Sequence, residues 1–248
     1  MNLNKYNQIY KKQGFIIVKK VFSKYQIKNL LTELELVKIK VEKKGKNQHF
    51  HKTKDGKFNT IHNIQTFHKS GKIFDLTKNK TLLKIISYLL DSAPVLRNIE
   101  FFLKPKKTGL STPFHQDNFY WNIVSAKALN VWIACTNVSK KNGGVCYLQG
   151  SHNLGTIKHE ISYAKGSSQK ISEKVLSFIN FKKIFPKISP GDCIIHHPEI
   201  IHGSYENKSN LERIGFVISF ISKKAKIDKV SLNKYKNNLK KNLSSIYN

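Results

Sequence analysis

The chain is poor in acidic residues, in arginine and in cysteine, and each shortage narrows what it can be. Its 248 residues include 15 Asp and Glu against 44 Lys and Arg, which gives a formal net charge of +29. Such an excess ordinarily favours nucleic acid, anionic lipid or an acidic substrate as the partner. Only two of the 44 basic residues are arginine, Arg97 and Arg213, so 42 are lysine.

The lysines are scattered from Lys5 to Lys241. Proteins that read nucleic acid favour arginine for its planar, bidentate fork, so we interpret the charge as a compositional bias that gives a solvated basic surface. A nucleic-acid partner is disfavoured. Because a site that needs only positive charge could use lysine, each of the two arginines is informative.

Three cysteines, Cys135, Cys146 and Cys193, lie far apart without the spacing of a zinc site or a disulfide framework. This pattern favours a reducing compartment. The first twenty residues carry charges throughout, and their longest apolar run, Phe15 to Val18, is too short for a signal segment or a membrane span. We therefore expect a cytoplasmic protein with no membrane association.

The N-terminal part has helical patterning. Residues 5–13 predict a short polar helix, and residues 14–18 predict a first strand. Ser23 is a suitable cap for a following helix with apolar residues at helical spacing. Residues 42–60 are polar and predict a long loop, and residues 81–90 predict a second amphipathic helix.

From residue 95 onward, short apolar runs alternate with turn residues, which is typical of an all-β sandwich or barrel. The predicted strands are Val95–Leu103, Phe114–Tyr120, Ala128–Thr136, Val145–Leu148, Cys193–His196 and Ile214–Ile221. Residues 153–188 predict an excursion over one mouth of the barrel. We expect one domain over 1–248, mainly β with flanking helices: a helical part over about 1–94, a core over about 95–222 and a basic tail over about 223–248, either a terminal helix or frayed.

A histidine and a carboxylate, His115 and Asp117, lie at the centre of the stretch from Pro113 to Trp121. If this stretch is extended, both side chains leave the same face of the strand. Together they could hold a divalent metal, and two histidines with one carboxylate form the site of non-haem iron oxygenases. This interpretation needs a second histidine.

The second histidine of choice is His202, where a predicted strand gives way to a loop at the edge of the core. Eleven positions later Arg213 opens the last strand, and its side chain could project into the same interior and bind a dicarboxylate through two parallel hydrogen bonds. His196 and His197 compete for the role of ligand, but neither has the Gly-Ser that follows His202 or the arginine downstream.

With these residues in place, the chain resembles the phytanoyl-CoA dioxygenase family of Fe(II)- and 2-oxoglutarate-dependent oxygenases. The resemblance covers nearly the whole chain, and it depends on the order and spacing of several short motifs. These are Gly14–Val18, His115-Gln116-Asp117, Trp132-Ile133-Ala134, Asn142-Gly143-Gly144, Gly150-Ser151-His152, Gly191-Asp192, His202-Gly203-Ser204, Asn207 and Arg213.

The resemblance implies a double-stranded β-helix core, the jelly-roll or cupin-like fold. It implies that His115, Asp117 and His202 bind iron and that Arg213 anchors the distal carboxylate of 2-oxoglutarate. Ser204 resembles the hydroxyl that assists this arginine. Asn98 and Trp132 fall where the family places residues that line the cosubstrate pocket.

The implied reaction consumes 2-oxoglutarate and O2, releases succinate and CO2, and hydroxylates a C–H bond of a small molecule. Related halogenases carry a small residue at the position of Asp117, so its presence favours hydroxylation or desaturation. Phe119 to Trp121 could form a wall of the substrate pocket, although aromatic residues at such positions are as often plain core. Lysines around the open end of the predicted barrel could attract an anionic substrate.

Two other classes of function stay open at this point. One is a basic nucleic-acid-binding protein in which the histidines and the carboxylate are structural. The other is a jelly-roll module that binds metal without turnover. The intact set of three ligands and Arg213 argues against both, because a degenerate relative would be expected to lose at least one of them.

Overall fold

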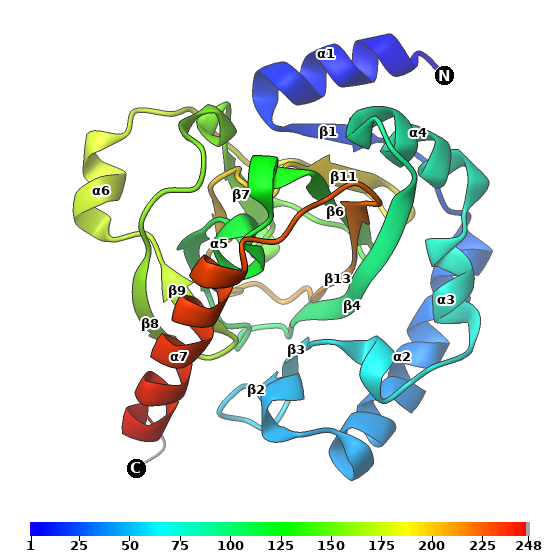
Figure 1. The fold of residues 1–248 in the computed structure, drawn as a ribbon. Helices are drawn as coiled ribbons and strands as arrows, with labels where there is room; N and C mark the ends of the chain where they lie inside the picture. Colours follow the sequence, from blue (N-terminus) through cyan, green and yellow to red (C-terminus); the bar gives the residue numbers. More distant parts are fainter. Residues whose placement is uncertain (247–248) are drawn as a thin grey trace.

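A computed structural model describes residues 1–246 as two facing antiparallel sheets with helices outside them (Figure 1). The larger sheet has the strand order β1-β11-β6-β13-β4-β3-β2, and the smaller one has the order β10-β7-β12-β5. Strands of the larger sheet are β1 (Phe15–Val18), β2 (Phe50–Lys52), β3 (Phe58–Ile61), β4 (Pro94–Lys104), β6 (Ala128–Ala134), β11 (Cys193–His196) and β13 (Arg213–Ser222). Strands of the smaller sheet are β5 (Thr112–His115), β7 (Val145–Leu148), β10 (Lys183–Ile184) and β12 (His202–Ser204). The predicted jelly-roll class is confirmed.

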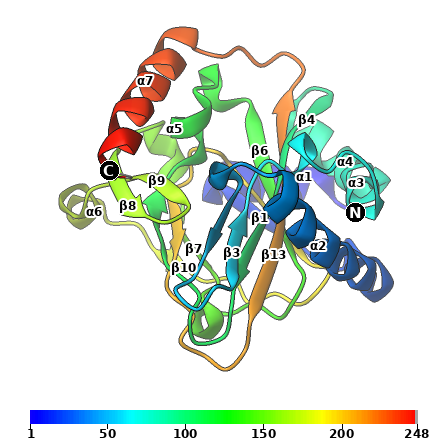
Figure 2. The ribbon, with the colours of Figure 1, turned by 90° about the horizontal axis from the view of Figure 1, so that it is seen from below.

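Four helices cover the outer face of the larger sheet: α1 (Leu3–Gln13), α2 (Lys24–Lys44), α3 (Lys72–Thr77) and α4 (Lys80–Leu90) (Figure 2). Helix α2 begins where predicted, because Ser23 and Gln26 form a reciprocal capping box. Apolar residues of these helices pack against alternate residues of the sheet, and each fully buried leucine contributes about 1.5–3 kcal/mol. The other face of the sheet looks toward the smaller sheet and forms a second core.

Two predicted boundaries were wrong. The polar stretch 42–60 is not a loop throughout: α2 continues to Lys44, and β2 and β3 pair with each other beside β4. The predicted strand Phe114–Tyr120 ends at His115, and the helix α5 (Asp117–Trp121) follows. Asn118 closes this turn, since its amide donates to Ile123 O at 3.1 Å and accepts from Ile123 N at 3.1 Å.

The predicted excursion, residues 153–188, contains the hairpin β8 (Glu160–Ala164) and β9 (Ser167–Lys170) and the short helix α6 (Glu173–Phe178). The described part of the tail forms the helix α7 (Lys229–Ile246), which runs beside this hairpin (Figure 1). The α7 residue Tyr235 lies edge-on to the rings of Phe119 and Tyr120, and its hydroxyl is 3.3 Å from Ser168 Oγ. The hairpin, α5 and α7 therefore pack together at one end of the barrel.

All three cysteines are buried, unpaired thiols on strands or at a strand end. Burial raises the pKa of each thiol, to about 11 for Cys146. None of the described helices is long and apolar enough to cross a membrane.

The turn Gly191-Asp192 joins the first strand to the core. A side chain at Gly191, which has φ +90°, would lie 2.1 Å from the Phe22 carbonyl oxygen, so only glycine fits there. The Asp192 carboxylate, 5% exposed, accepts hydrogen bonds at 2.9 Å from the backbone N–H groups of Lys20 and Ser189 and pairs with Lys19. Burial would raise the pKa of Asp192, but these donors lower it overall.

We expect Asp192→Asn to lower the free energy of unfolding by about 1–3 kcal/mol, because a buried acceptor is lost. Since the pKa of Asp192 is lower in the folded state, its contribution is present above the unfolded value and is lost as pH falls through the folded value. Urea unfolding at pH 7 and pH 3 measures both effects. The exposed Asp91→Asn is the matched control; equal losses for the two variants would contradict the prediction.

Candidate metal centre

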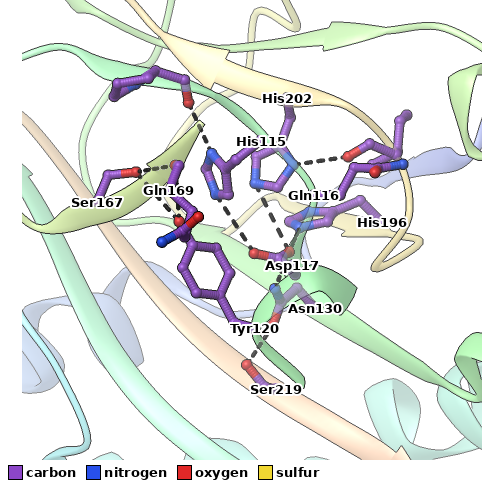
Figure 3. A network of polar contacts seen from close by, with 12 residues as sticks. His115, Gln116, Asp117, Tyr120, Asn130, Ser167, Gln169, His196, His202 and Ser219 are labelled. Atoms are coloured by element: carbon purple, nitrogen blue, oxygen red, sulfur yellow. Dashed lines mark hydrogen bonds and ion pairs between the residues drawn. The ribbon is translucent and has the colours of Figure 1, made fainter. Parts of the chain in front are cut away.

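The pairing of β12 with β5 places His202 directly opposite His115. The two imidazole rings have centroids 4.4 Å apart. Asp117 is the first residue of α5 and not part of the strand, but the backbone at Gln116 between the two residues is extended, and both side chains lie on one side of the chain. The carboxylate reaches the histidines because the backbone stays extended at Gln116, with φ −124° and ψ 133°, and the helical turn begins only at Asp117 (Figure 3).

Ligand atoms of His115, Asp117 and His202 all lie within 4.8 Å of one another. His115 Nε2 is 3.7 Å from Asp117 Oδ1, and His202 Nε2 is 3.8 Å from Asp117 Oδ2. All three residues are mostly buried, with side chains 11–14% exposed. Three such atoms around one point can hold a single ion and leave further coordination positions open.

The other ring nitrogen of each histidine fixes its tautomer. His115 Nδ1 lies 2.8 Å from Pro113 O, and His202 Nδ1 lies 3.0 Å from Ile200 O. Because a carbonyl oxygen can only accept, both Nδ1 atoms must donate. Both Nε2 lone pairs then point toward Asp117, which is the orientation a metal requires.

A ring of polar groups fixes the carboxylate (Figure 3). Asn130 Nδ2 donates to Asp117 Oδ2 at 2.7 Å, and Ser219 donates in turn to Asn130 Oδ1. His196 Nε2 donates to the same Asp117 oxygen at 3.2 Å, while its Nδ1 lies 3.1 Å from the Tyr147 hydroxyl. His196 therefore orients the carboxylate instead of completing the triad of ligand atoms.

The second competing histidine lies elsewhere. The ring of His197 packs against the rings of His152 and Tyr10. Burial and the neighbouring histidines His152 and His196 lower the pKa of His197 to about 3. His197 is a neutral packing residue in this position.

The protonation states suit a cation. Burial would raise the pKa of Asp117, but the electrostatic influence of His202 and the hydrogen bond from His196 Nε2 lower it well below its ordinary value. Burial lowers the pKa of His202 to about 3, although Asp117 opposes the shift. An ionised carboxylate beside a neutral imidazole is the combination that binds a divalent metal.

Arg213 is buried at the start of β13, with 2% of its surface exposed. Its guanidinium donates to Gly143 O from Nε and Nη2, at 3.2 and 3.0 Å, and to Phe102 O from Nη1 at 3.1 Å. Burial lowers the pKa of Arg213 to about 9. Among the described side chains, no carboxylate lies within ion-pairing distance of it.

Lys104 lies opposite Arg213 in register on β4 and is also 2% exposed. Its ammonium donates to the carbonyl oxygens of Leu110 and Tyr205. Burial lowers the pKa of Lys104, and the charge of Arg213 lowers it further. Two buried basic side chains therefore lie on neighbouring strands, with donors directed to backbone carbonyls.

The other residues predicted to contact the cosubstrate lie at two different places on the inner face of the larger sheet. The Trp132 ring lies 5.4 Å from the Arg213 guanidinium and covers Gly215, where a Cβ would meet the ring at 2.0 Å. Asn98 lies opposite Ser219, about 20 Å along β13 from Arg213 and hence at the Asp117 end. Ser204 is buried two residues after His202, but the described hydrogen bonds of Arg213 do not include it, so its assisting role stays a prediction.

The family model for phytanoyl-CoA dioxygenase matches residues 10–215. The chain belongs to the phytanoyl-CoA dioxygenase family. A probable phytanoyl-CoA dioxygenase of Caenorhabditis elegans is 22% identical over 218 residues, covering 82% of this chain and 70% of that protein. Peroxisomal phytanoyl-CoA dioxygenase of Homo sapiens is 22% identical over 218 residues, covering 82% of this chain and 63% of its own length.

Solved structures show the same fold. The epimerase SnoN, in complex with Fe3+, alpha ketoglutarate and nogalamycin RO, superposes with a TM-score of 0.70 at 19% identity. The match covers 90% of this chain and 84% of that one. At this level of identity the likeness supports the cupin-like architecture of the family.

Sequence reasoning missed three residues of the site: Asn130, His196 as a partner of Asp117, and Lys104. Each lies on a strand of the larger sheet and faces the smaller one, among apolar neighbours. A buried polar residue at a core-facing position was the available signal, since such residues are normally hydrogen-bonded for a reason.

We expect Asn130→Ala to weaken metal binding by about 10–100-fold, because the Asp117 carboxylate loses its shortest hydrogen bond. Titration with Mn(II) or Fe(II) under anaerobic conditions measures the affinity. Asn153→Ala changes an exposed asparagine and is the control. An unchanged affinity in a folded Asn130→Ala protein would show that Asn130 does not position the ligand.

Proposed function

We propose that this chain is an Fe(II)- and 2-oxoglutarate-dependent dioxygenase that hydroxylates a C–H bond of a small molecule and releases succinate and CO2. The carrying observation is the convergence of His115, Asp117 and His202 within 4.8 Å, in a chain of this family. His115 and His202 would bind the iron through their Nε2 atoms, which carry no proton, and Asp117 would bind it through its ionised carboxylate.

When bound, iron and 2-oxoglutarate supply the oxidising chemistry that activates O2. The chain's own residues would bind the iron and the cosubstrate and hold the ligand side chains in one orientation. His115 and His202 keep their Nδ1 protons on backbone carbonyls, which holds the rings in one orientation. Asn130 and His196 hold Asp117 ionised on one rotamer, so the position of the ligand does not depend on solvent.

Arg213 would anchor the distal carboxylate of 2-oxoglutarate, and Lys104 adds a second positive charge. Both side chains are desolvated, and their donors go to backbone carbonyls that carry no full charge. An incoming carboxylate gains charge-assisted hydrogen bonds there. As the family resemblance implies, Trp132 and Ser204 would line this pocket, and Asn98 would line its end nearer Asp117.

The charge of the substrate and the cellular compartment of the protein are also proposals. The substrate is a small molecule, and the excess of lysine supports an anionic one. The peroxisomal name belongs to the human relative; the three unpaired cysteines support our expectation of a reducing compartment such as the cytoplasm. The division into parts over about 1–94, 95–222 and 223–248 is likewise proposed for a single domain, with β1, β2 and β3 of the first part joining the core sheet.

The alternatives predict other results. A nucleic-acid-binding protein would show metal-independent affinity that falls steeply with salt. A metal-binding module without turnover would lose iron on His115→Ala, and the parent would release no succinate with any substrate. Arg213 is buried and has no carboxylate partner among the described side chains, which favours the dioxygenase with a bound dicarboxylate over both alternatives.

We expect anaerobic addition of Fe(II) and 2-oxoglutarate to produce a metal-to-ligand charge-transfer absorption band. His115→Ala, Asp117→Ala and His202→Ala each remove one ligand and should abolish the band while the chain stays folded. His197→Ala, outside the triad, should retain it. Absence of the band in the parent, with no 2-oxoglutarate turnover for any substrate, would overturn the proposed function.

We expect Arg213→Gln to weaken 2-oxoglutarate binding by at least about 100-fold, because a bidentate charged contact is worth several kcal/mol in a buried site. Metal affinity should change little, since Arg213 contacts none of the three ligands. Titrating 2-oxoglutarate against the charge-transfer band separates the two affinities. Arg213→Lys should recover part of the loss, and an unchanged affinity in Arg213→Gln would remove the anchor role.

A further inference from the structure

Arg97, the second of the two arginines, lies on a β-bulge of β4. Ser219 of β13 pairs with Asn98, and the next residue, Phe220, pairs with Leu96, so Arg97 is the extra residue. A bulge turns a side chain out of the regular alternation. Here it directs Arg97 toward α5, the helix that Asp117 begins.

The guanidinium of Arg97 lies over an aromatic ring. It lies 4.6 Å from the ring of Trp121, the last residue of α5, and Nη1 donates to Asn98 Oδ1 at 3.1 Å. Trp121 is itself buried, with 7% of its surface exposed. Stacking fixes the plane of the guanidinium and leaves donors at its edge for a ligand.

No carboxylate among the described side chains pairs with Arg97. The acid near it on β4, Glu100, is 2.9 Å from His62 Nδ1. Burial lowers the pKa of Arg97, and the charges of Glu100 and Asp117 only partly oppose this shift. A partly buried guanidinium without an ion-pair partner is costly unless a ligand completes it.

Arg97 lies near the residues that position the metal ligand Asp117, whose charge acts on it. Its neighbour Asn98 stands in one cross-strand row with Ser219 and Asn130, and Asn130 holds Asp117. Two strand spacings separate Asn98 from Asn130, about 10 Å. Arg97 and Arg213 lie toward opposite ends of the paired strands β4 and β13, so the Arg97 guanidinium does not lie beside the proposed carboxylate anchor.

A buried hydroxyl lies further along the same face, toward the Arg213 end of β4. Thr60 of β3 is paired with Phe102 and is 3% exposed, yet its hydroxyl has no hydrogen-bond partner. The hairpin residue Gly166 covers it, since a Cβ there would be 3.1 Å from Thr60 Oγ1. Unsatisfied buried hydroxyls are rare and indicate a missing partner.

We propose that Arg97 binds an anionic group of the substrate, a carboxylate or a phosphate, and that the substrate is therefore a small polar acid. This inference rests on the proposed function, because it requires the oxidised carbon to lie beside the metal held by Asp117. Glu100 and His62 add polar groups on the same face, between Arg97 and the Arg213 end of β4. Such a surface suits hydroxyl or amino groups and is unsuited to a long apolar chain.

The test is a matched panel given to the holoenzyme with Fe(II) and 2-oxoglutarate. Amino acids, hydroxy acids and sugar phosphates are each paired with the neutral amide, methyl ester or unphosphorylated sugar. Substrate-stimulated succinate formation is the readout. We expect the acid of a pair to stimulate at least tenfold more than its neutral partner, and the carboxylates and phosphates in the panel distinguish the two groups.

In Arg97→Gln we expect the KM of the stimulating acid to rise at least tenfold, with Arg97→Lys intermediate. The affinity for 2-oxoglutarate, read from the charge-transfer band, should stay within twofold of the parent. Lys106→Gln removes an exposed cation of the same chain segment and should leave both values unchanged.

Two results would overturn the inference while the band persists: equal stimulation by acids and neutral partners, or an unchanged preference in Arg97→Gln. Absence of any stimulation by the acids in the parent would also overturn it. Loss of the band in the parent would instead refute the proposed function. Thermal unfolding of both Arg97 variants shows whether either has a folding defect. If Arg97→Gln is unfolded, the KM of Arg97→Lys is compared with that of the parent instead.

Discussion

The site depends on one pairing, that of β12 with β5, which sets His202 opposite His115 although 86 residues separate them in the chain. A shift of this register by one residue would turn His202 away from His115, because successive side chains leave opposite faces. Strand β7 pairs with β12 on its other side and restricts such a shift. The carboxylate then reaches both rings because Asp117 follows His115 after a single extended residue, Gln116.

The two arginines and their surroundings show how the fold uses scarce residues. Arg213 is buried and Arg97 is partly buried; they lie on the paired strands β13 and β4, and each guanidinium lies over a tryptophan ring. Neither has a carboxylate partner among the described side chains. The lysines, in contrast, lie mostly at exposed positions, where a flexible charge costs little. Planarity and desolvation, and not charge alone, distinguish the two arginine positions.

Much of this arrangement could be predicted from local sequence, and the failures have a common cause. His115, Asp117, His202 and Arg213 were identifiable because each lies in a short motif at a strand edge. The turn at α5 was missed because the aromatic run from Phe119 to Trp121 has high strand propensity, and contacts of Asn118 with Ile123 and Pro198 override it. The strands β2 and β3 were missed because β4, the strand that ties β3 to the sheet, comes more than thirty residues later, and the local sequence is polar. Asn130 and His196 become partners of Asp117 only after β6, β11 and α5 meet.

The three buried thiols have a consequence for an enzyme that would handle O2. Because only a thiolate reacts readily with oxidants or alkylating agents, the folded chain presents no such nucleophile at neutral pH. Cys135 and Cys193 lie in the core beneath the helices, whereas Cys146 is on the smaller sheet next to β12. The rate at which each thiol becomes labelled would therefore report the opening of one sheet separately from the other, without any label added to the metal site.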